Sequence, residues 1–323
     1  MHISIFTTIS DPIGRQDLYL EAIKNYLDFA DEVIIIIGDH LRKDNSGLGE
    51  HMPIWFPKYD DKLRMSFYEW PKEFSWEFIG QQFQRGYDFC TGDWVLRMDI
   101  DYFIHEEDFE TIREFLKNCK APAAKVSKKQ FLLVDRYRIK SLLPIAFNKG
   151  MYGDRIKLDS GGDLCQPSLD GKELPFDKIP TIMKPEIVTV SDNVTSGQRE
   201  RRLPKSFEKD GVIYSLSQPL PIWNYECILR TKDVEVKEFA RFARAWKRKF
   251  KSDRWGAESE EAAMKKFMEM QLGRFRGNKW EKIILEAHPK YIQETIKNLR
   301  SDQFGYSLWG NEKPAEYFKK AVG

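Results

Sequence analysis

The feature that most constrains the fold is the unbroken aliphatic run Val33-Ile34-Ile35-Ile36-Ile37. A run of β-branched residues with no polar residue at alternate positions fits a strand that is covered on both faces. Strands of this kind lie in the middle of parallel sheets, which have helices packed on both sides. Residues 32–38 are therefore predicted to form a central parallel strand of an α/β domain.

The neighbouring segments continue an alternation of strands and helices. Residues 2–9 and 63–70 are rich in β-branched and aromatic residues, as is typical of strands. Residues 16–30 have apolar side chains at helical spacing, and a second amphipathic helix around 79–87 precedes the apolar segment 94–98. The order predicts a doubly wound α/β sheet, in which ligands bind at the carboxyl ends of the strands.

The second half of the chain is less regular. A helix is expected over 106–118, and residues 121–231 mix short strands with Gly- and Pro-rich loops. Further helices are predicted for residues 233–250, 258–275, 280–287 and 290–299. We therefore expect a domain of residues 1–231 and a helical C-terminal extension, residues 232–323, packed on it.

Two aspartates follow the apolar segment 94–98 as Asp99-Ile100-Asp101. If this tripeptide continues the strand, its two carboxylates point the same way, because strand side chains alternate between faces. Paired carboxylates hold Mg²⁺ or Mn²⁺ well, and a bound diphosphate can complete the coordination shell. The bare tripeptide is equally compatible with a solvated strand end or a helix cap.

The context of this pair resembles a known family. Residues 91–101, Thr-Gly-Asp-Trp-Val-Leu-Arg-Met-Asp-Ile-Asp, look like the segment before and through the metal motif of family-two-type GT-A glycosyltransferases. The resemblance covers residues 3–118 in element order and extends more loosely to Tyr225. It implies a Rossmann-like GT-A fold, a mixed sheet flanked by helices that binds a nucleotide-diphosphate sugar.

The resemblance also implies roles at the metal. Asp101 would bind Mn²⁺ or Mg²⁺ directly, and Asp99 would touch the ribose of the nucleotide or a metal-bound water. Many relatives complete the metal shell with a histidine in a Trp-His-Tyr-like stretch. This chain has Trp223-Asn224-Tyr225-Glu226 instead. Asn224 is therefore the expected third ligand, with Glu226 as the other oxygen available there.

The nucleotide-facing residues are likewise implied by the resemblance. Thr7 and Thr8 end the first strand, where the family places the nucleoside. Asp39 follows the second strand, where an aspartate often recognises the base; a loop-capping role is the alternative. Gln84, next to Arg85 in the helix before the metal motif, occupies a position where the family often has a nucleotide-facing polar residue.

Inverting transfer needs a base that takes the proton of the acceptor hydroxyl as the new glycosidic bond forms. The best candidate is Asp163, because the adjacent Gly161-Gly162 pair allows a tight loop close to a ligand. Its surroundings resemble a Gly-Asp-x-Gln-like segment of some of these enzymes. Asp159 and Asp192 are the next candidates, and ordinary turn chemistry is the alternative for Asp163.

Two basic features add possible contacts. Arg199, Arg201 and Arg202 form a cluster that either closes over a diphosphate or is a solvated charged loop. The predicted helix up to Phe250 has an aromatic face and a set of basic side chains: Arg241, Arg244, Lys247, Arg248 and Lys249. This helix either packs on the catalytic domain or contacts anionic lipid at the membrane periphery.

We conclude from the sequence that the chain is a metal-dependent, inverting glycosyltransferase with a glycan, lipid-linked or small-molecule acceptor. A non-catalytic protein of the same fold that binds glycans or nucleotides is the alternative, and a sugar nucleotidyltransferase is a second one. The net charge of only +2 gives no reason to expect nucleic acid. Four scattered cysteines and the lack of an N-terminal targeting pattern or long apolar segment lead us to expect a cytoplasmic location.

Overall fold

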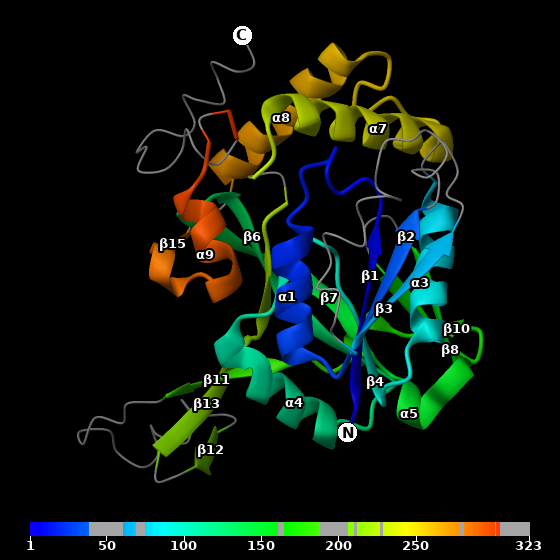
Figure 1. Ribbon diagram of the computed structural model, residues 1–323, viewed down its shortest axis with the longest axis vertical. Helices are drawn as coiled ribbons and strands as arrows, with labels where there is room; N and C mark the ends of the chain where they lie inside the picture. Colours follow the sequence, from blue (N-terminus) through cyan, green and yellow to red (C-terminus); the bar gives the residue numbers. More distant parts are fainter. Residues whose placement is uncertain are drawn as a thin grey trace.

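The computed structural model is a mixed α/β sheet with helices on both faces and a helical layer across one edge (Figure 1). The structure describes residues 1–38, 61–68, 75–160, 165–187, 206–209, 212–226, 229–277, 281–300 and 302–303.

One half of the main sheet is parallel. Its strands are β1 (Ile3–Ile9), β2 (Glu32–Gly38), β3 (Leu63–Tyr68) and β4 (Trp94–Arg97), in the order β3-β2-β1-β4. Two helices link them, α1 (Tyr19–Phe29) and α3 (Trp76–Phe89).

The β2 strand is buried along its whole length. Val33, Ile35 and Ile37 belong to the core cluster that includes the buried face of α1, whereas Ile34 and Ile36 pack in the cluster that includes α3. Both faces of the strand are therefore covered, and the prediction of a central parallel strand is confirmed.

The other half of the sheet is mostly antiparallel. Its strands are β7 (Arg136–Asn148), β6 (Ala123–Leu133), β14 (Pro221–Asn224), β5 (Tyr102–Phe103) and β15 (Glu281–Lys282). β7 runs antiparallel to β4 and joins the two halves, while β14 runs parallel to β6. The predicted mixed sheet flanked by helices is confirmed.

Two smaller sheets and short helices complete the irregular middle of the chain. The first sheet, β8 (Ile156–Ser160), β9 (Cys165–Leu169) and β10 (Lys172–Glu173), packs on α3. The second, β11 (Met183–Ile187), β13 (Val212–Pro219) and β12 (Ser206–Lys209), extends from the main body (Figure 1). The helices of this part are α4 (Phe109–Asn118), which follows a 3-10 turn, and the short α5 (Lys149–Tyr152).

The C-terminal part contains α7 (Lys232–Phe250), α8 (Glu260–Gly277) and α9 (Lys290–Lys297). In Figure 1, α7 crosses above the carboxyl ends of β1 and β2. The helix predicted for residues 280–287 is wrong. Glu281 and Lys282 instead pair with Tyr137 and Arg136 as strand β15, because β7 offers them backbone partners, and only a 3-10 turn at 285–287 follows.

Of the helices in the described ranges, none has the length and apolar character needed to cross a bilayer. The described cysteines are free thiols; Cys90 and Cys165 are buried and Cys119 is half-buried.

Candidate functional site

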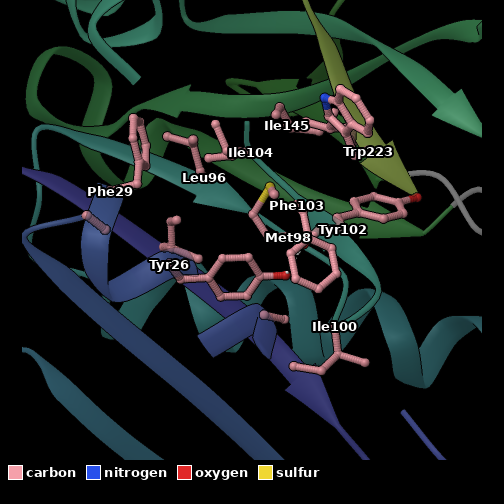
Figure 2. Close-up of a cluster of buried hydrophobic side chains, with 14 of the residues drawn as sticks. Tyr26, Phe29, Leu96, Met98, Ile100, Tyr102, Phe103, Ile104, Ile145 and Trp223 are labelled. Carbon is pink, nitrogen blue, oxygen red and sulfur yellow. Dashed lines mark hydrogen bonds between the residues drawn. The ribbon is translucent and has the colours of Figure 1, made fainter. Parts of the chain in front are cut away.

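The two motif aspartates lie in a tight turn at the carboxyl edge of the sheet. β4 ends at Arg97, and the turn is closed by the Tyr102 N–H, which donates to the Asp99 carbonyl at 2.9 Å. The Tyr26 hydroxyl lies 2.6 Å from the Asp99 carbonyl oxygen and 2.9 Å from that of Tyr102. Figure 2 shows Tyr26, Met98 and Tyr102 in the buried cluster around this turn.

The sequence-based expectation that Asp99 and Asp101 project together from a strand is therefore corrected. The last ladder bond, from the Met98 N–H to the Phe6 carbonyl at 3.0 Å, precedes both residues. Because the backbone turns between them, their carboxylates contact different partners. The two charges still interact, since Asp99 is among the groups that raise the pKa of Asp101.

Asp99 is held by Arg97, whose guanidinium donates a hydrogen bond to its Oδ1. Arg97 is buried in β4 and lies over the Phe83 ring, 4.3 Å from its centroid. The Asp99 side chain keeps 30% of its surface exposed. One carboxylate of the pair is thus fixed in orientation and remains open to a ligand.

Asp101 contacts the end of strand β14. The Asn224 Nδ2 donates to Asp101 Oδ2 at 3.0 Å, and the Tyr225 N–H donates to the Asp101 carbonyl at 3.0 Å. Burial and the charges of Asp99 and Glu226 raise the pKa of Asp101 to about 7, although Arg230 and Lys128 oppose the shift. Negative charge thus accumulates at this point of the site.

Glu226 supplies the third carboxylate. Its Oε2 accepts a hydrogen bond from Gln130 Nε2 at 3.2 Å, and Gln130 Oε1 accepts from Arg138 Nε at 3.1 Å and Nη2 at 2.6 Å. Gln130 and Arg138 are paired on β6 and β7. The sheet therefore positions Glu226 through a buried amide, an arrangement that sequence reasoning missed beyond noting the Glu226 oxygen.

A buried arginine lies beside these carboxylates. Arg230 donates to Asp17, in the loop after β1, and to Glu235 of α7 at 3.3 Å. Its positive charge lowers the pKa of Asp101, whereas burial raises the pKa of Glu235 to about 7 despite Arg230. Arg230 links the C-terminal helix to the carboxyl edge of the sheet, and no local sequence pattern points to it.

The residues at the turn fit a hard divalent cation in their chemistry. Asn224 Oδ1 is buried without a hydrogen-bond partner, and the Asp101 and Glu226 carboxylates add oxygens of the type that Mg²⁺ and Mn²⁺ prefer. Within the described ranges, no group of three or more His, Cys, Asp or Glu side chains is arranged to hold a metal alone. A metal here would take further ligands from a substrate.

The structure places the predicted nucleotide-facing residues in different surroundings. Thr7 and Thr8 lie in the last part of β1, before Ile9; Thr7 is buried and its hydroxyl has no hydrogen-bond partner, and Thr8 is half-buried. Gln84 is turned to the β8 sheet, where its Oε1 accepts from the Leu158 N–H at 2.7 Å and its Nε2 donates to Asp88 at 2.6 Å. Asp39 lies outside the described residues.

Asp163, the predicted base, also lies outside the described residues, as do Asp192 and the cluster Arg199, Arg201 and Arg202. Ser160 and Cys165 are the described residues on either side of Asp163, and Cys165 is near enough to the Asp99–Asp101 turn to feel the charge of Asp99. Cys165 is buried, and burial together with the charges of Asp99 and Asp159 raises its pKa to about 12. Asp159 is exposed on β8, with its Oδ1 accepting from the Ser160 N–H at 2.7 Å.

No family model matches the sequence, and no curated protein matches it. Among solved structures, residues 1–349 of TarS from S. aureus are 15% identical over 42% of this chain and 40% of that chain, with a TM-score of 0.30. A mannosyltransferase, PcManGT from Pyrobaculum calidifontis in complex with GDP-Man and Mn²⁺, is 10% identical over 99% and 85%, with a TM-score of 0.38. A 4-diphosphocytidyl-2C-methyl-D-erythritol synthase is 10% identical over 48% and 78%, with a TM-score of 0.31.

The match to TarS spans well under two thirds of that chain. At these identities and TM-scores, the similarities assign neither a family nor an activity to this protein. What the structure itself defines is an α/β protein with a mixed sheet and a carboxylate-rich turn at the carboxyl edge of its parallel half.

Proposed function

We propose that the protein is a metal-dependent glycosyltransferase of the GT-A type that moves a sugar from a nucleotide-diphosphate donor to an acceptor hydroxyl with inversion. The observation that carries the proposal is the turn at Asp99–Asp101. It follows the central strand β4 directly, lies next to β1 in the sheet, and is close to Asn224 and Glu226 at the end of β14. Ligands of open α/β sheets bind at this edge.

Metal binding and donor binding would fall to different residues of the site. Asp101, Glu226 and Asn224 would hold Mn²⁺ or Mg²⁺, and Asp99, oriented by Arg97, would orient the donor. A bound divalent ion would stabilise the negative charge of the departing nucleotide diphosphate. Thr7 and Thr8, near the carboxyl end of β1, would lie on the nucleoside side of the donor.

In the transfer, the bond from the anomeric carbon to the diphosphate oxygen breaks, and the nucleotide diphosphate leaves with the electron pair. The acceptor oxygen forms the new bond from the opposite face, and its proton passes to a carboxylate. We assign this base to Asp163. The support is that Cys165, two residues on, is close enough to Asp99 for that charge to raise its pKa.

Thermal unfolding in the presence of UDP, GDP, dTDP and CDP, each with and without Mn²⁺, tests the site. Saturation at 100 times Kd stabilises a protein by about 2.7 kcal/mol. We expect one nucleotide to raise the melting temperature only when metal is present. Asp101→Asn should abolish the shift, whereas Asp154→Asn, at an exposed position on the 3-10 turn before β8, should retain it.

The outcomes also separate the alternatives. Metal-dependent nucleotide binding without hydrolysis or transfer of any nucleotide sugar would indicate a binding protein of this fold. Release of pyrophosphate from a nucleoside triphosphate and a sugar phosphate would indicate a nucleotidyltransferase. No stabilisation by any nucleotide with metal present would contradict the proposal.

A further inference from the structure

A lysine of strand β6 is buried beside the candidate site. Lys128 is 3% exposed, and its ammonium donates to the Tyr102 hydroxyl at 2.9 Å. Among the described residues, no carboxylate lies within ion-pair distance of this ammonium. A buried charge is costly when no opposite charge is paired with it, so the position of Lys128 needs an explanation.

The strand order places the Lys128 ammonium over β14. Lys128 is on β6, Tyr102 is on β5, and β14 lies between these two strands. The lysine side chain therefore crosses β14 to reach the Tyr102 hydroxyl. Asn224 of β14 is the register partner of Tyr102, so its side chain is on the same face of the sheet. The ammonium thus lies on the face where Asn224 contacts Asp101.

The charge of Lys128 already acts on the site. Burial raises the pKa of Asp101, and Lys128 is one of the cations that oppose this shift, as is Arg230. The two cations differ in their partners. The Arg230 guanidinium bonds to carboxylates of the loop after β1 and of α7, whereas the Lys128 ammonium bonds to a neutral hydroxyl. The charge of Lys128 is therefore not committed to an ion pair within the described chain.

A divalent ion held by Asp101 and Asn224 would meet this ammonium at short range. Like charges repel more strongly in a buried site than in water, so the ammonium opposes the binding of Mn²⁺ or Mg²⁺ alone. A nucleotide diphosphate carries negative charge on both phosphates and attracts the ion and the ammonium together. Its arrival would therefore offset the repulsion between them, which couples metal binding to nucleotide binding.

We propose that Lys128 suppresses the binding of a divalent metal ion to the empty site, so that the ion binds together with the nucleotide diphosphate. This inference rests on the proposed function, because it concerns the same metal and nucleotide site. In the empty protein Lys128 would act as an internal cation that partly balances the carboxylates of the site.

Titration of the full chain with Mn²⁺ alone, followed by the electron paramagnetic resonance signal of the free ion, tests the role of Lys128. Lys128→Gln removes the charge but keeps an amide that can donate to the Tyr102 hydroxyl. We expect this variant to bind Mn²⁺ about tenfold more tightly than the wild type. The control is Lys125→Gln, at another buried lysine of β6, whose ammonium donates to the Phe176 carbonyl at 2.7 Å. It should bind Mn²⁺ as the wild type does.

The same titration with UDP or GDP present measures the coupling. In the wild type, the nucleotide that binds should raise the Mn²⁺ affinity, and the rise should be about tenfold smaller in Lys128→Gln. Melting temperatures check that each variant is folded, and Lys128→Met repeats the test if the glutamine variant is not.

Two results would overturn the role of Lys128: an unchanged Mn²⁺ affinity in the folded Lys128 variant, or an equal gain in Lys125→Gln. A different result would contradict the proposed function. If no nucleotide changes the Mn²⁺ affinity of any of these proteins while Lys128→Gln still binds Mn²⁺ more tightly, the site does not take a nucleotide with its metal, and the suppression of metal binding by Lys128 is supported.

Discussion

At the scale of single residues, one ionisable group whose surroundings shift its pKa is His288. It is fully buried beside Phe131, with ring centroids 5.1 Å apart, and its Nδ1 lies 2.8 Å from the Tyr225 hydroxyl. Burial lowers the pKa of His288 to about 4, the charges of Lys129 and His105 act in the same direction, and the Val134 carbonyl opposes them. The folded protein therefore favours the neutral imidazole.

This shift predicts a pH dependence of stability. Between pH 6.5 and about 4 the unfolded chain holds a proton on His288 that the folded chain does not, so the free energy of unfolding falls as the pH falls through this window. The full contribution is about 3 kcal/mol, at 1.36 kcal/mol per pKa unit. Urea unfolding at several pH values should show a shallower acid dependence for His288→Gln. An unchanged slope would contradict the assignment.

The candidate site could be predicted only where its residues share a local pattern. Asp99 and Asp101 follow an apolar strand, and Asn224 lies in a short motif, so the sequence was sufficient to name all three as candidates. The structure brings Asn224 into contact with Asp101, and the roles of the three residues at a metal stay predictions. Glu226 needs Gln130 and Arg138 to define its position, and those contacts cross 96 and 8 residues of chain. Gln84 could not be placed from the sequence. The helical spacing alone does not say which side of α3 its side chain lies on, and the packing of β8 on α3 decides this by giving it the Leu158 N–H as a partner.

At the scale of elements, the sheet depends on the close approach of α3. Gly86 allows this contact, because a Cβ added there would lie 2.2 Å from Cδ2 and 2.6 Å from Cγ of the Phe6 ring in β1. Phe6 is buried in the core cluster on the α3 side of the sheet, so the ring has no room to move away.

Gly86→Ala is therefore expected to destabilise the protein. Overpacking costs about 1–3 kcal/mol, and the better helix propensity of alanine returns up to about 1 kcal/mol. Gly273→Ala is the matched control: it lies in α8, is exposed, and a Cβ there would meet nothing within 4 Å. That change should stabilise by up to about 1 kcal/mol. Denaturant unfolding should show a lower free energy of unfolding for Gly86→Ala and a higher one for Gly273→Ala. Changes of the same sign in the two variants would contradict the role of Gly86.

Element identity was predictable where one periodicity dominated. The buried run in β2, the amphipathic helices α1 and α7, and the succession of strands and helices along the N-terminal part of the chain were all confirmed. The turn at Asp99–Asp101 and the strand β15 were not predicted, because each depends on a partner distant in sequence. Tyr26 approaches the carbonyls of the turn from α1, and β7 recruits Glu281 and Lys282 from the C-terminal part.

At the scale of the whole molecule, a buried charge network joins the loop after β1 to the start of α7. Arg230 bonds to Asp17, 213 residues away, and to Glu235 at the start of α7. The side chain of Arg230 is 11% exposed, that of Asp17 is 3% exposed and that of Glu235 is 8% exposed. Because water reaches these groups so little, their ionised forms depend on the ion pairs between them. The Thr231 N–H adds a second link by donating to Gln16 Oε1 at 2.8 Å. The C-terminal helices are thus fixed to the carboxyl edge of the sheet by polar contacts.

Replacing Arg230 should show how much the stability of the protein depends on this charge network. Arg230→Met removes the cation that pairs with the buried Glu235 and leaves Asp17 with Arg15 alone, at 2.9 Å, and we expect it to lower the free energy of unfolding by about 3–5 kcal/mol in urea titrations. Arg155→Met breaks a pair with Asp170 whose side chains are 58% and 53% exposed, and it should lower the stability far less, because water already solvates both charges. Adding Asp17→Leu and Glu235→Leu to Arg230→Met should recover much of the loss, because the penalty comes from unpaired charge and the apolar replacements carry none. If Arg230→Met costs no more than Arg155→Met, the network does not hold the C-terminal helices in place, and their position over the carboxyl edge must depend on apolar packing.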